Sequence, residues 1–243
     1  MKNFKVTADY HTHTFYSDGH DSVEDNVREA VSKGLEVIGI TDHGFNHCMG
    51  GIKRSDIPKL RAEIERVQAK YPNIKILLGI EANLLNYDGE LDIQQSDIDS
   101  LDYIIFGVHK FTFGKKVRGS FLFNARNLLW DTVKHKQKIT DSYLKALEKY
   151  PVKIVVHPNY ATACDVGRLA RACAEKGVWF ELNGKRIDFN AEEVEAIKQS
   201  GVDLVLSSDA HHSQNVGDMS LQQEFIEKYD LPLEKIVNIK IVK

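Results

Sequence analysis

Seven short apolar runs, each followed by a polar loop and then by a stretch with helical spacing, restrict the possible folds of this chain most strongly. The runs are rich in Val, Ile and Leu and span residues 5–9, 36–41, 74–81, 101–108, 152–156, 178–182 and 202–206. Strands that are apolar along their whole length are buried on both faces, as in parallel sheets covered by helices. The alternation therefore predicts an α/β fold built on a parallel sheet.

The stretches between these runs have amphipathic helical spacing. They cover residues 22–33, 55–70, 124–149, 165–176, 191–200 and 221–229. The first has Asp21 or Ser22 as its N-cap and ends before Gly34, a typical C-terminal signal. Because no linker or change in composition divides the 243 residues, we expect one domain over residues 1–243, closed into an α/β barrel. An open doubly wound sheet is the alternative, but the first run lacks the G-x-G-x-x-G turn of dinucleotide-binding folds.

Histidines and acids occur where the predicted strands end. In a barrel of this type the functional groups lie at the carboxyl ends of the strands. His11 and His13 follow the first run, and alternate residues of an extended chain face the same side. The later runs end at Asp42 and His43, Glu81, His109, His157, and Asp209 and His211. Six of the ten histidines thus share one predicted rim, which scattered surface histidines would not do.

Imidazole and carboxylate groups at this density indicate a metal site. Both bind zinc, iron and manganese, and a carboxylate can bridge two ions. The set is too large for a single tetrahedral ion, so it predicts a multinuclear centre. The three cysteines, Cys48, Cys164 and Cys173, stand apart from the set, which argues against a cysteine-rich structural zinc site.

The same residues, taken in order, form a recognisable series of motifs. The series is His11-Thr12-His13 with Ser17-Asp18-Gly19, Thr41-Asp42-His43, Gly79-Ile80-Glu81, His109, His157-Pro158 and Ser208-Asp209-Ala210-His211. It resembles the PHP superfamily, named for polymerase and histidinol phosphatase, over residues 9–212. The resemblance implies a distorted seven-stranded (β/α) TIM-like barrel with a trinuclear metal centre and phosphoesterase chemistry.

The resemblance also implies a set of metal ligands, carried over residue by residue. A first ion would take His11, His13, Glu81 and Asp209, a second would share Glu81 and take His109 and His157, and a third would take Asp18, His43 and His211. His20 lies close enough in sequence to compete with Asp18 for the third ion. We therefore expect two or three divalent ions, with zinc first and iron or manganese as alternatives.

The expected reaction is hydrolysis of a phosphate monoester. Zinc lowers the pKa of bound water from ~15.7 to ~7, so a hydroxide between the two ions that share Glu81 would be the nucleophile. Glu81 and Asp209 would act in catalysis as ligands of these ions. Asp42 is either the general acid or, more in keeping with its position beside a ligand, a hydrogen-bond acceptor that orients a neighbour, and Asp9 has that second role.

Two cationic side chains are candidates for substrate binding. Lys110 directly follows a predicted ligand, and Arg186 follows the sixth run, next to Lys185. Arg is suited to bidentate phosphate recognition. The predicted partner is thus a small phosphorylated substrate, of which histidinol phosphate is one candidate.

Charge and hydropathy restrict the other functions. The chain has 32 basic and 35 acidic residues, a net charge of −3, and lacks a long basic tract, so nucleic acid is not a favoured partner. A nuclease remains the alternative, with Lys110, Lys115, Lys116 and Arg118 along a groove. A non-catalytic metal-binding module is disfavoured, because it would not require ligands on six of seven strands. The chain has no apolar run of membrane-spanning length, and we expect a cytoplasmic protein with reduced thiols and no membrane partner. The oligomeric state stays open.

Overall fold

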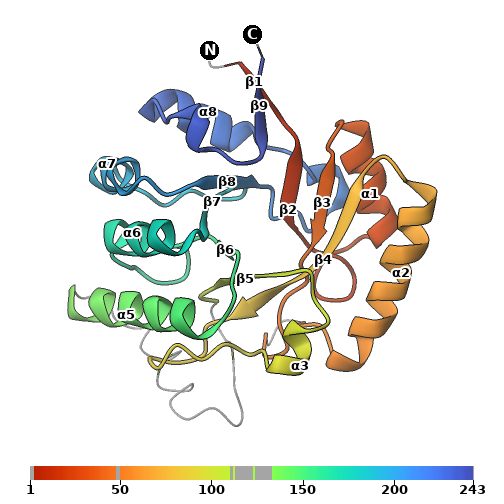
Figure 1. Ribbon diagram of the computed structural model, residues 1–243, viewed down its shortest axis with the longest axis horizontal. Coiled ribbons are helices and arrows are strands. Elements are labelled where there is room, and N and C mark those ends of the chain that lie inside the picture. Colours follow the sequence, from red (N-terminus) through yellow and green to blue (C-terminus); the bar gives the residue numbers. More distant parts are fainter. Residues whose placement is uncertain (1–2, 48–49, 110–111, 113–122, 124–132, 243) are drawn as a thin grey trace.

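The fold is a barrel of seven parallel strands surrounded by helices (Figure 1). The computed structural model describes residues 3–47, 50–109, 112, 123 and 133–242. The barrel strands are β2 (Ala8–Thr12), β3 (Val37–Ile40), β4 (Lys75–Asn83), β5 (Tyr103–Gly107), β6 (Ile154–Val155), β7 (Trp179–Asn183) and β8 (Leu204–Ser207), and they pair in that order. The two ends of the sheet meet where the His13 amide donates to the Ala210 carbonyl at 2.8 Å. The predicted seven-stranded barrel is confirmed.

Helices cover the outer face of the sheet, with α1 and α2 on one side and α5 to α8 on the other (Figure 1). They are α1 (Val23–Ser32), α2 (Ile57–Lys70), α3 (Gln95–Ile98), α5 (Val133–Lys149), α6 (Val166–Lys176), α7 (Ala191–Ser200) and α8 (Ser220–Tyr229). Ser22 and Asp25 form a capping box at the start of α1. Gly177 and Gly201, both in the left-handed region, end α6 and α7. The predicted helix 124–149 matches α5 from residue 133, and residues 124–132 lie outside the described part of the chain.

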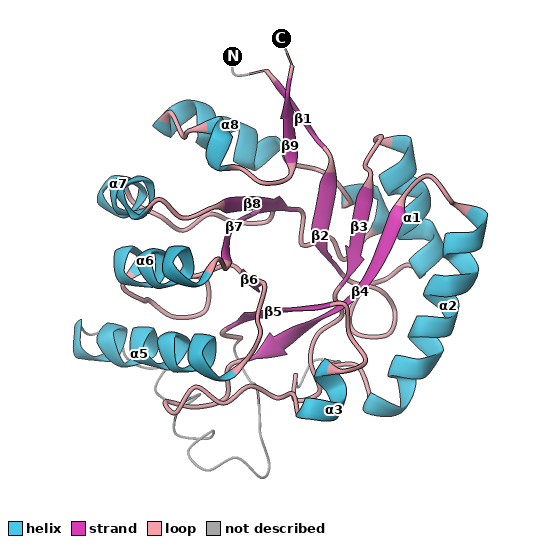
Figure 2. Ribbon diagram, in the orientation of Figure 1, coloured by secondary structure: helices cyan, strands magenta, loops and turns pink. Residues whose placement is uncertain are grey.

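The first predicted strand is wrong in one respect, because residues 5–9 belong to two different strands. β1 (Phe4–Val6) pairs antiparallel with β9 (Ile239–Ile241), which the sequence patterns did not predict, and this ribbon extends from the barrel to both termini (Figure 2). The chain changes sheets at Thr7, whose amide donates to the Asn238 carbonyl at 2.9 Å. The side-chain amide of Asn238 donates to the carbonyls of Ala8 and Leu206. Since Asn238 lies 231 positions after Thr7 and 230 after Ala8, nothing local marks the change.

The barrel interior is apolar at the amino-terminal ends of the strands. We call this region the apolar floor; it consists of Tyr10, Tyr103, Ile105, Ile154, Val156, Trp179 and Val205. Tyr10 contacts the edge of Tyr103 at a ring distance of 6.2 Å and Trp179 at 5.4 Å. Gly39 is required here, because a Cβ atom at this position would lie 1.8 Å from the Tyr103 hydroxyl. The larger core lies between the outer face of the strands and the helices.

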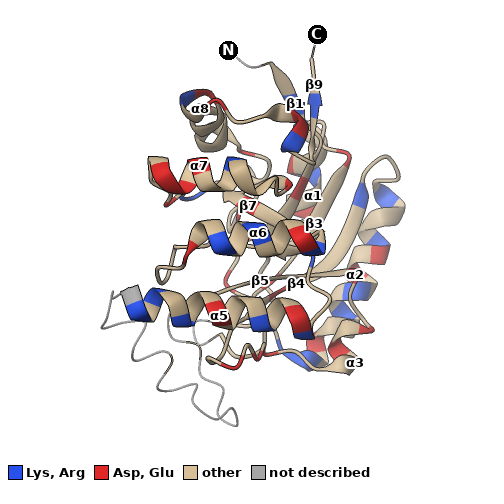
Figure 3. Ribbon diagram, turned by 60° about the vertical axis from the view of Figure 1, so that its left-hand side comes forward, with Lys and Arg blue, Asp and Glu red and all other residues tan. Residues whose placement is uncertain are grey.

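The outer surface carries both signs of charge. Lys, Arg, Asp and Glu are mixed along the outward faces of α5, α6 and α7 (Figure 3). Within the described ranges, no helix combines the length and the apolar character that a bilayer crossing requires.

Candidate metal centre

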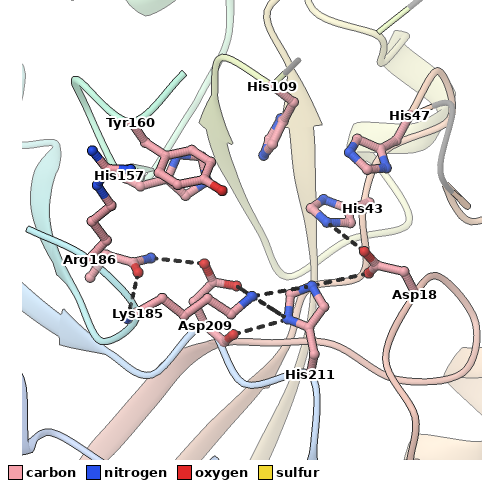
Figure 4. Close-up of a pocket in the computed structure, with 11 residues that line it drawn as sticks. Asp18, His43, His47, His109, His157, Tyr160, Lys185, Arg186, Asp209 and His211 are labelled. Atoms are coloured by element: carbon pink, nitrogen blue, oxygen red, sulfur yellow. Dashed lines mark hydrogen bonds and ion pairs between the residues drawn. The ribbon is translucent and has the colours of Figure 1, made fainter. Parts of the chain in front are cut away.

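The carboxyl ends of the barrel strands carry a cluster of histidines and acids, which we call the polar rim. It consists of His11, His13, Asp18, His43, Glu81, His109, His157, Asp209 and His211, the nine residues predicted as ligands. Asp18, His43, His109, His157, Asp209 and His211 line a cavity of about 570 Å³ (Figure 4). His11, His13 and Glu81 are fully buried. Residues separated by up to 200 positions in sequence therefore meet at one place.

Glu81 is at the centre of the polar rim. It lies on the inner face of β4, the longest barrel strand, which carries it up among the histidines. The nearest imidazole nitrogens to Oε1 are those of His157 (2.7 Å), His109 (2.9 Å) and His11 (3.3 Å), and the nearest to Oε2 are those of His43 (2.6 Å) and His13 (3.5 Å). One carboxylate thus faces imidazoles from both halves of the barrel, as a ligand shared by two ions would.

A second group surrounds Asp18, which lies in the loop between β2 and α1. Its carboxylate is 3.2 Å from His211 Nε2, 3.5 Å from His43 Nε2 and 4.0 Å from His13 Nδ1 (Figure 4). His20 does not join this group: it is exposed and stacks on His212, with ring centres 4.1 Å apart. The geometry therefore favours Asp18 over His20.

Asp42 holds the loop that carries Asp18. Its buried carboxylate accepts hydrogen bonds from the Thr14 amide and hydroxyl, both at 2.8 Å, and from the Ser17 hydroxyl at 2.6 Å. Burial, opposed by these bonds, raises its pKa to about 6. Asp42 is not among the described residues that line the cavity, so the general-acid interpretation does not fit its position.

Asp9 has a similar role on the adjacent strand. Its carboxylate accepts from the amides of Gly217 at 2.8 Å, Ser208 at 3.1 Å and His11 at 3.3 Å. Asp9 therefore orients backbone at the strand ends, as expected, and does so through amides rather than an imidazole.

Lys185 and Arg186 form part of the cavity wall (Figure 4). Lys185 Nζ lies 2.7 Å from His211 Nδ1 and 3.2 Å from Asp209 Oδ1. Arg186 donates to Asp188 at 2.5 Å, and its guanidinium lies 5.8 Å from the ring of Tyr160. The predicted Lys110, and with it Lys115, Lys116 and Arg118, lies outside the described residues.

Four residues at the site were not among those predicted. Tyr160, Asn183 and His47 line the cavity, and His47 stacks on His43 with ring centres 4.0 Å apart. Glu181 is buried behind His11. Glu181 and Asn183 lie at the end of β7, and His47 and Tyr160 lie in loops that follow β3 and β6. This position at the carboxyl ends of the strands was the only sequence signal for them, and many residues without a function share it.

The polar rim fits divalent cations, because its ligand atoms face one another. Among the described residues, His13 Nδ1, His109 Nδ1 and His157 Nδ1 are buried without a hydrogen-bond partner, and Asp18 Oδ1 and Glu81 Oε2 lie near imidazole nitrogens without a well-aligned hydrogen bond. Leaving one such atom unpaired costs about 1–3 kcal/mol, and a cation coordinated by the lone pairs would remove that cost. Three groups have ligand atoms within 4.8 Å of one another: His13, Asp18, His43 and His211; His11, His13 and Glu81; and His43, Glu81 and His109.

The electrostatics of the cluster agree with this fit. Burial disfavours the charged form of Glu81, but the surrounding imidazoles outweigh it and hold the pKa of Glu81 well below its usual range. Burial lowers the pKa of His109 to about 4 against the attraction of Glu81, which keeps this imidazole neutral. For His43, Glu81 and Asp18 overcome burial and raise the pKa to about 10. Metal binding needs ionised carboxylates and neutral imidazoles, which Glu81 and His109 provide, and a divalent ion bound to His43 would take the place of its proton.

A comparison with family models decides the family. The model described as PHP domain matches residues 9–204. The chain belongs to the PHP domain family. This PHP protein is similar along most of its length to proteins named probable phosphatases, with 27% identity to one from Acetivibrio thermocellus (98% of this chain, 93% of the relative) and 28% to one from Shewanella sp. strain ANA-3 (95% and 86%).

Solved structures share the fold of the PHP protein. A histidinol phosphate phosphatase from Lactococcus lactis, complexed with zinc, L-histidinol and phosphate, matches with a TM-score of 0.65 and 20% identity over 93% of this chain and 94% of that one. A histidinol phosphatase from Listeria monocytogenes, described as putative, matches with a TM-score of 0.59 and 14% identity over 89% and 99%. At sequence identities this low, the similarity shows that the barrel fold is shared.

Proposed function

We propose that this PHP protein hydrolyses the phosphate monoester of a small molecule with two or three divalent ions, zinc foremost, bound in the polar rim. Membership of the PHP family, together with relatives named probable phosphatases, identifies the reaction class as metal-dependent phosphate-ester hydrolysis. The observation that carries the finer proposal is the position of Glu81, which contacts His11 and His13 of one proposed set and His109 and His157 of another.

The proposed ligands divide into three sets, two of which share Glu81. One ion would be held by His11, His13, Glu81 and Asp209, a second by Glu81, His109 and His157, and a third by Asp18, His43 and His211. When bound, the ions make a hydroxide nucleophile available at neutral pH and neutralise the phosphate oxygens. Glu81 would be shared by the first two sets, and Asp209, with Oδ1 3.3 Å from His13 Nε2, would complete the first set.

The cavity wall supplies positive charge for the substrate. Lys185 Nζ is beside His211 and Asp209, where it would meet a phosphate oxygen that approaches the third set. Arg186 is next along the wall and has its guanidinium near Tyr160, which leaves it within reach of the rest of the ester. A cavity of about 570 Å³ has the size of a small-molecule site.

A phosphate-release screen with metal-loaded protein tests this function. The panel holds sugar phosphates, amino-alcohol phosphates including histidinol phosphate, nucleoside monophosphates, bis(p-nitrophenyl) phosphate and single-stranded oligonucleotides. We expect turnover of monoesters, with His109→Ala, which removes a ligand and leaves the barrel folded, as the inactive control. Cleavage of the diester and the oligonucleotides without monoester turnover would overturn the proposal in favour of a nuclease.

A further inference from the structure

β7 is the one barrel strand that supplies no proposed metal ligand, yet its end points into the polar rim. Trp179, Glu181 and Asn183 alternate along its inner face, and Trp179 belongs to the apolar floor. Phe180 and Leu182 point outward into the larger core. Glu181 is only 1% exposed and Asn183 only 3%, so the strand places a carboxylate and an amide inside the barrel.

Glu181 determines which nitrogen of His11 carries the proton. Its Oε1 lies 2.8 Å from His11 Nδ1. Because an ionised carboxylate can only accept, Nδ1 carries a proton, and in the neutral imidazole that a metal ion requires the lone pair is on Nε2. This Nε2 faces the cluster, 3.1 Å from His13 Nε2 and 3.3 Å from Glu81 Oε1.

The other oxygen of Glu181 holds the backbone of a second proposed ligand. Its Oε2 accepts from the His157 amide at 2.7 Å. His157 has a φ of 30°, a conformation that residues other than glycine rarely adopt. The hydrogen bond stabilises this turn, from which His157 Nε2 reaches Glu81 Oε1 at 2.7 Å.

Asn183 extends the same network to a third proposed ligand. Its side-chain amide donates to Glu181 Oε2 at 3.0 Å and to Asp209 Oδ2 at 3.1 Å. The other oxygen of Asp209 stays toward His13. Among the described residues, Glu181 forms no ion pair with Lys or Arg, and the His11 imidazole is the basic group it contacts. A buried carboxylate without such a partner is costly as a purely structural element.

We propose that Glu181 is a positioning residue of the metal centre, which fixes the Nδ1–H tautomer of His11 and the backbone of His157 and so preorganises ligands from two strands. The inference rests on the proposed function, because it assumes that the polar rim binds metal. It gives β7 a role: this strand acts through other residues and supplies no metal ligand of its own.

Glu181→Gln is a sharp test, because Glu181 accepts from three N–H donors: His11 Nδ1, the His157 amide and the side-chain amide of Asn183. Glutamine has one acceptor and one donor, so it cannot serve His11 Nδ1–H and the His157 amide together. Either His11 shifts to the Nε2–H tautomer or the His157 amide loses its partner. Asp97→Asn is the matched control, since Asp97 is also a buried carboxylate but pairs with Arg54 in the segment before β5.

The measurements are zinc affinity by chelator competition on the full chain and the His11 tautomer by long-range ¹H–¹⁵N NMR, assigned with His11→Gln. We expect Glu181→Gln to weaken zinc binding by about 10–100-fold, the usual effect of losing a partner of a metal ligand, and to reduce the Nδ1–H form of His11, while Asp97→Asn does neither. Should Glu181→Gln not fold, Glu181→Asp, whose shorter side chain draws both acceptors back, should weaken zinc binding in the same direction.

Unchanged zinc affinity and an unchanged His11 tautomer in Glu181→Gln would overturn the role of Glu181. Tight zinc binding by the wild-type chain without turnover of any monoester would instead overturn the proposed function. Since the affinity comparison does not depend on turnover, the two failures are distinguishable.

Discussion

The two halves of the barrel interior are built on opposite principles. In the apolar floor, Tyr103 donates its hydroxyl hydrogen to the Tyr10 carbonyl at 2.7 Å, and aliphatic side chains fill the remaining space. In the polar rim, imidazole nitrogens and carboxylate oxygens gather within 4.8 Å of one another, and several of those in the described residues have no hydrogen-bond partner. The same strands pass through both halves. The floor and the rim differ because the strands carry apolar side chains along their length and histidines or acids at or just after their carboxyl ends.

This contrast indicates how the fold tolerates its site. The floor and the outer core bury apolar surface, which stabilises the folded chain. The rim concentrates ionisable groups that are costly to bury unless they are paired. The stability of the floor therefore offsets the cost of the rim, and mutations in the two halves should separate stability from activity.

The largest expected effect is on activity, in Glu81→Gln. The bound ions contribute several kcal/mol to transition-state stabilisation, so loss of the ligand shared by two of them should lower kcat/KM by about 1000-fold or more. Steady-state phosphate release measures this. Glu63→Gln, a partly buried carboxylate on α2, is the control and should keep full activity. Near-normal turnover by Glu81→Gln would show that the rim is not the reaction centre.

A floor substitution should produce the opposite result. Ile105 is fully buried, and Ile105→Ala should lower the free energy of unfolding by about 2–5 kcal/mol. Denaturant titration measures the loss. Metal content and kcat at a temperature where the variant is folded should match the wild type. If Ile105→Ala kept normal stability but lost its metal, the separation of stability in the floor from metal binding in the rim would be contradicted.

Metal removal should affect the rim without altering the floor. An ion present at a hundredfold excess over its Kd stabilises the native state by about 2.7 kcal/mol. Chelation should therefore lower Tm by roughly 5–10 °C, at 2–4 °C for each kcal/mol, and abolish turnover. Thermal scans in the presence of a chelator test this, with zinc-saturated chelator as the control. An unchanged Tm with unchanged activity after chelation would contradict a bound metal centre.

The smallest effects should come from the cavity wall. Lys185→Ala removes a cation beside His211 and Asp209, and it should raise KM for a monoester and Ki for inorganic phosphate by about 10-fold, or 1.4 kcal/mol. Arg186→Ala should cost less, because Asp188 already pairs with this guanidinium. Lys198→Ala on α7, which is outside the cavity lining, serves as the control. A larger loss for Arg186 than for Lys185 would reverse the assigned order.

Much of the barrel could be predicted because its signals are local. Apolar runs, helical spacing and glycine stops each reflect a few neighbouring residues, and parallel topology then brings the strand ends together. This is why His11, Glu81 and His157 could be grouped from the sequence alone, although chain segments of more than 60 residues separate them. The pairing of β1 with β9 had no such local signal, because it joins the two ends of the chain.

The rest of the site depends on contacts across the fold. Glu181 ends an ordinary apolar strand, and its role appears only when His11, 170 positions away, is placed beside it. His47 is in a glycine-rich loop that carries no motif of its own, and only the fold shows that it stacks on His43. Asp42 adjoins His43 in the sequence, which leaves both a general-acid and an orienting role open, but its side chain turns toward Thr14 and Ser17. Sequence position locates the rim, and side-chain direction assigns the roles within it.

Zinc titration of metal-free protein, with bound metal per chain and phosphate release followed in the same sample, tests the central claim most directly. We predict that monoester hydrolysis rises from zero as the second and third ions bind and that it saturates at two or three ions per chain. Folded protein that hydrolyses monoesters with less than one ion per chain, or that binds three ions without turnover, would contradict the claim.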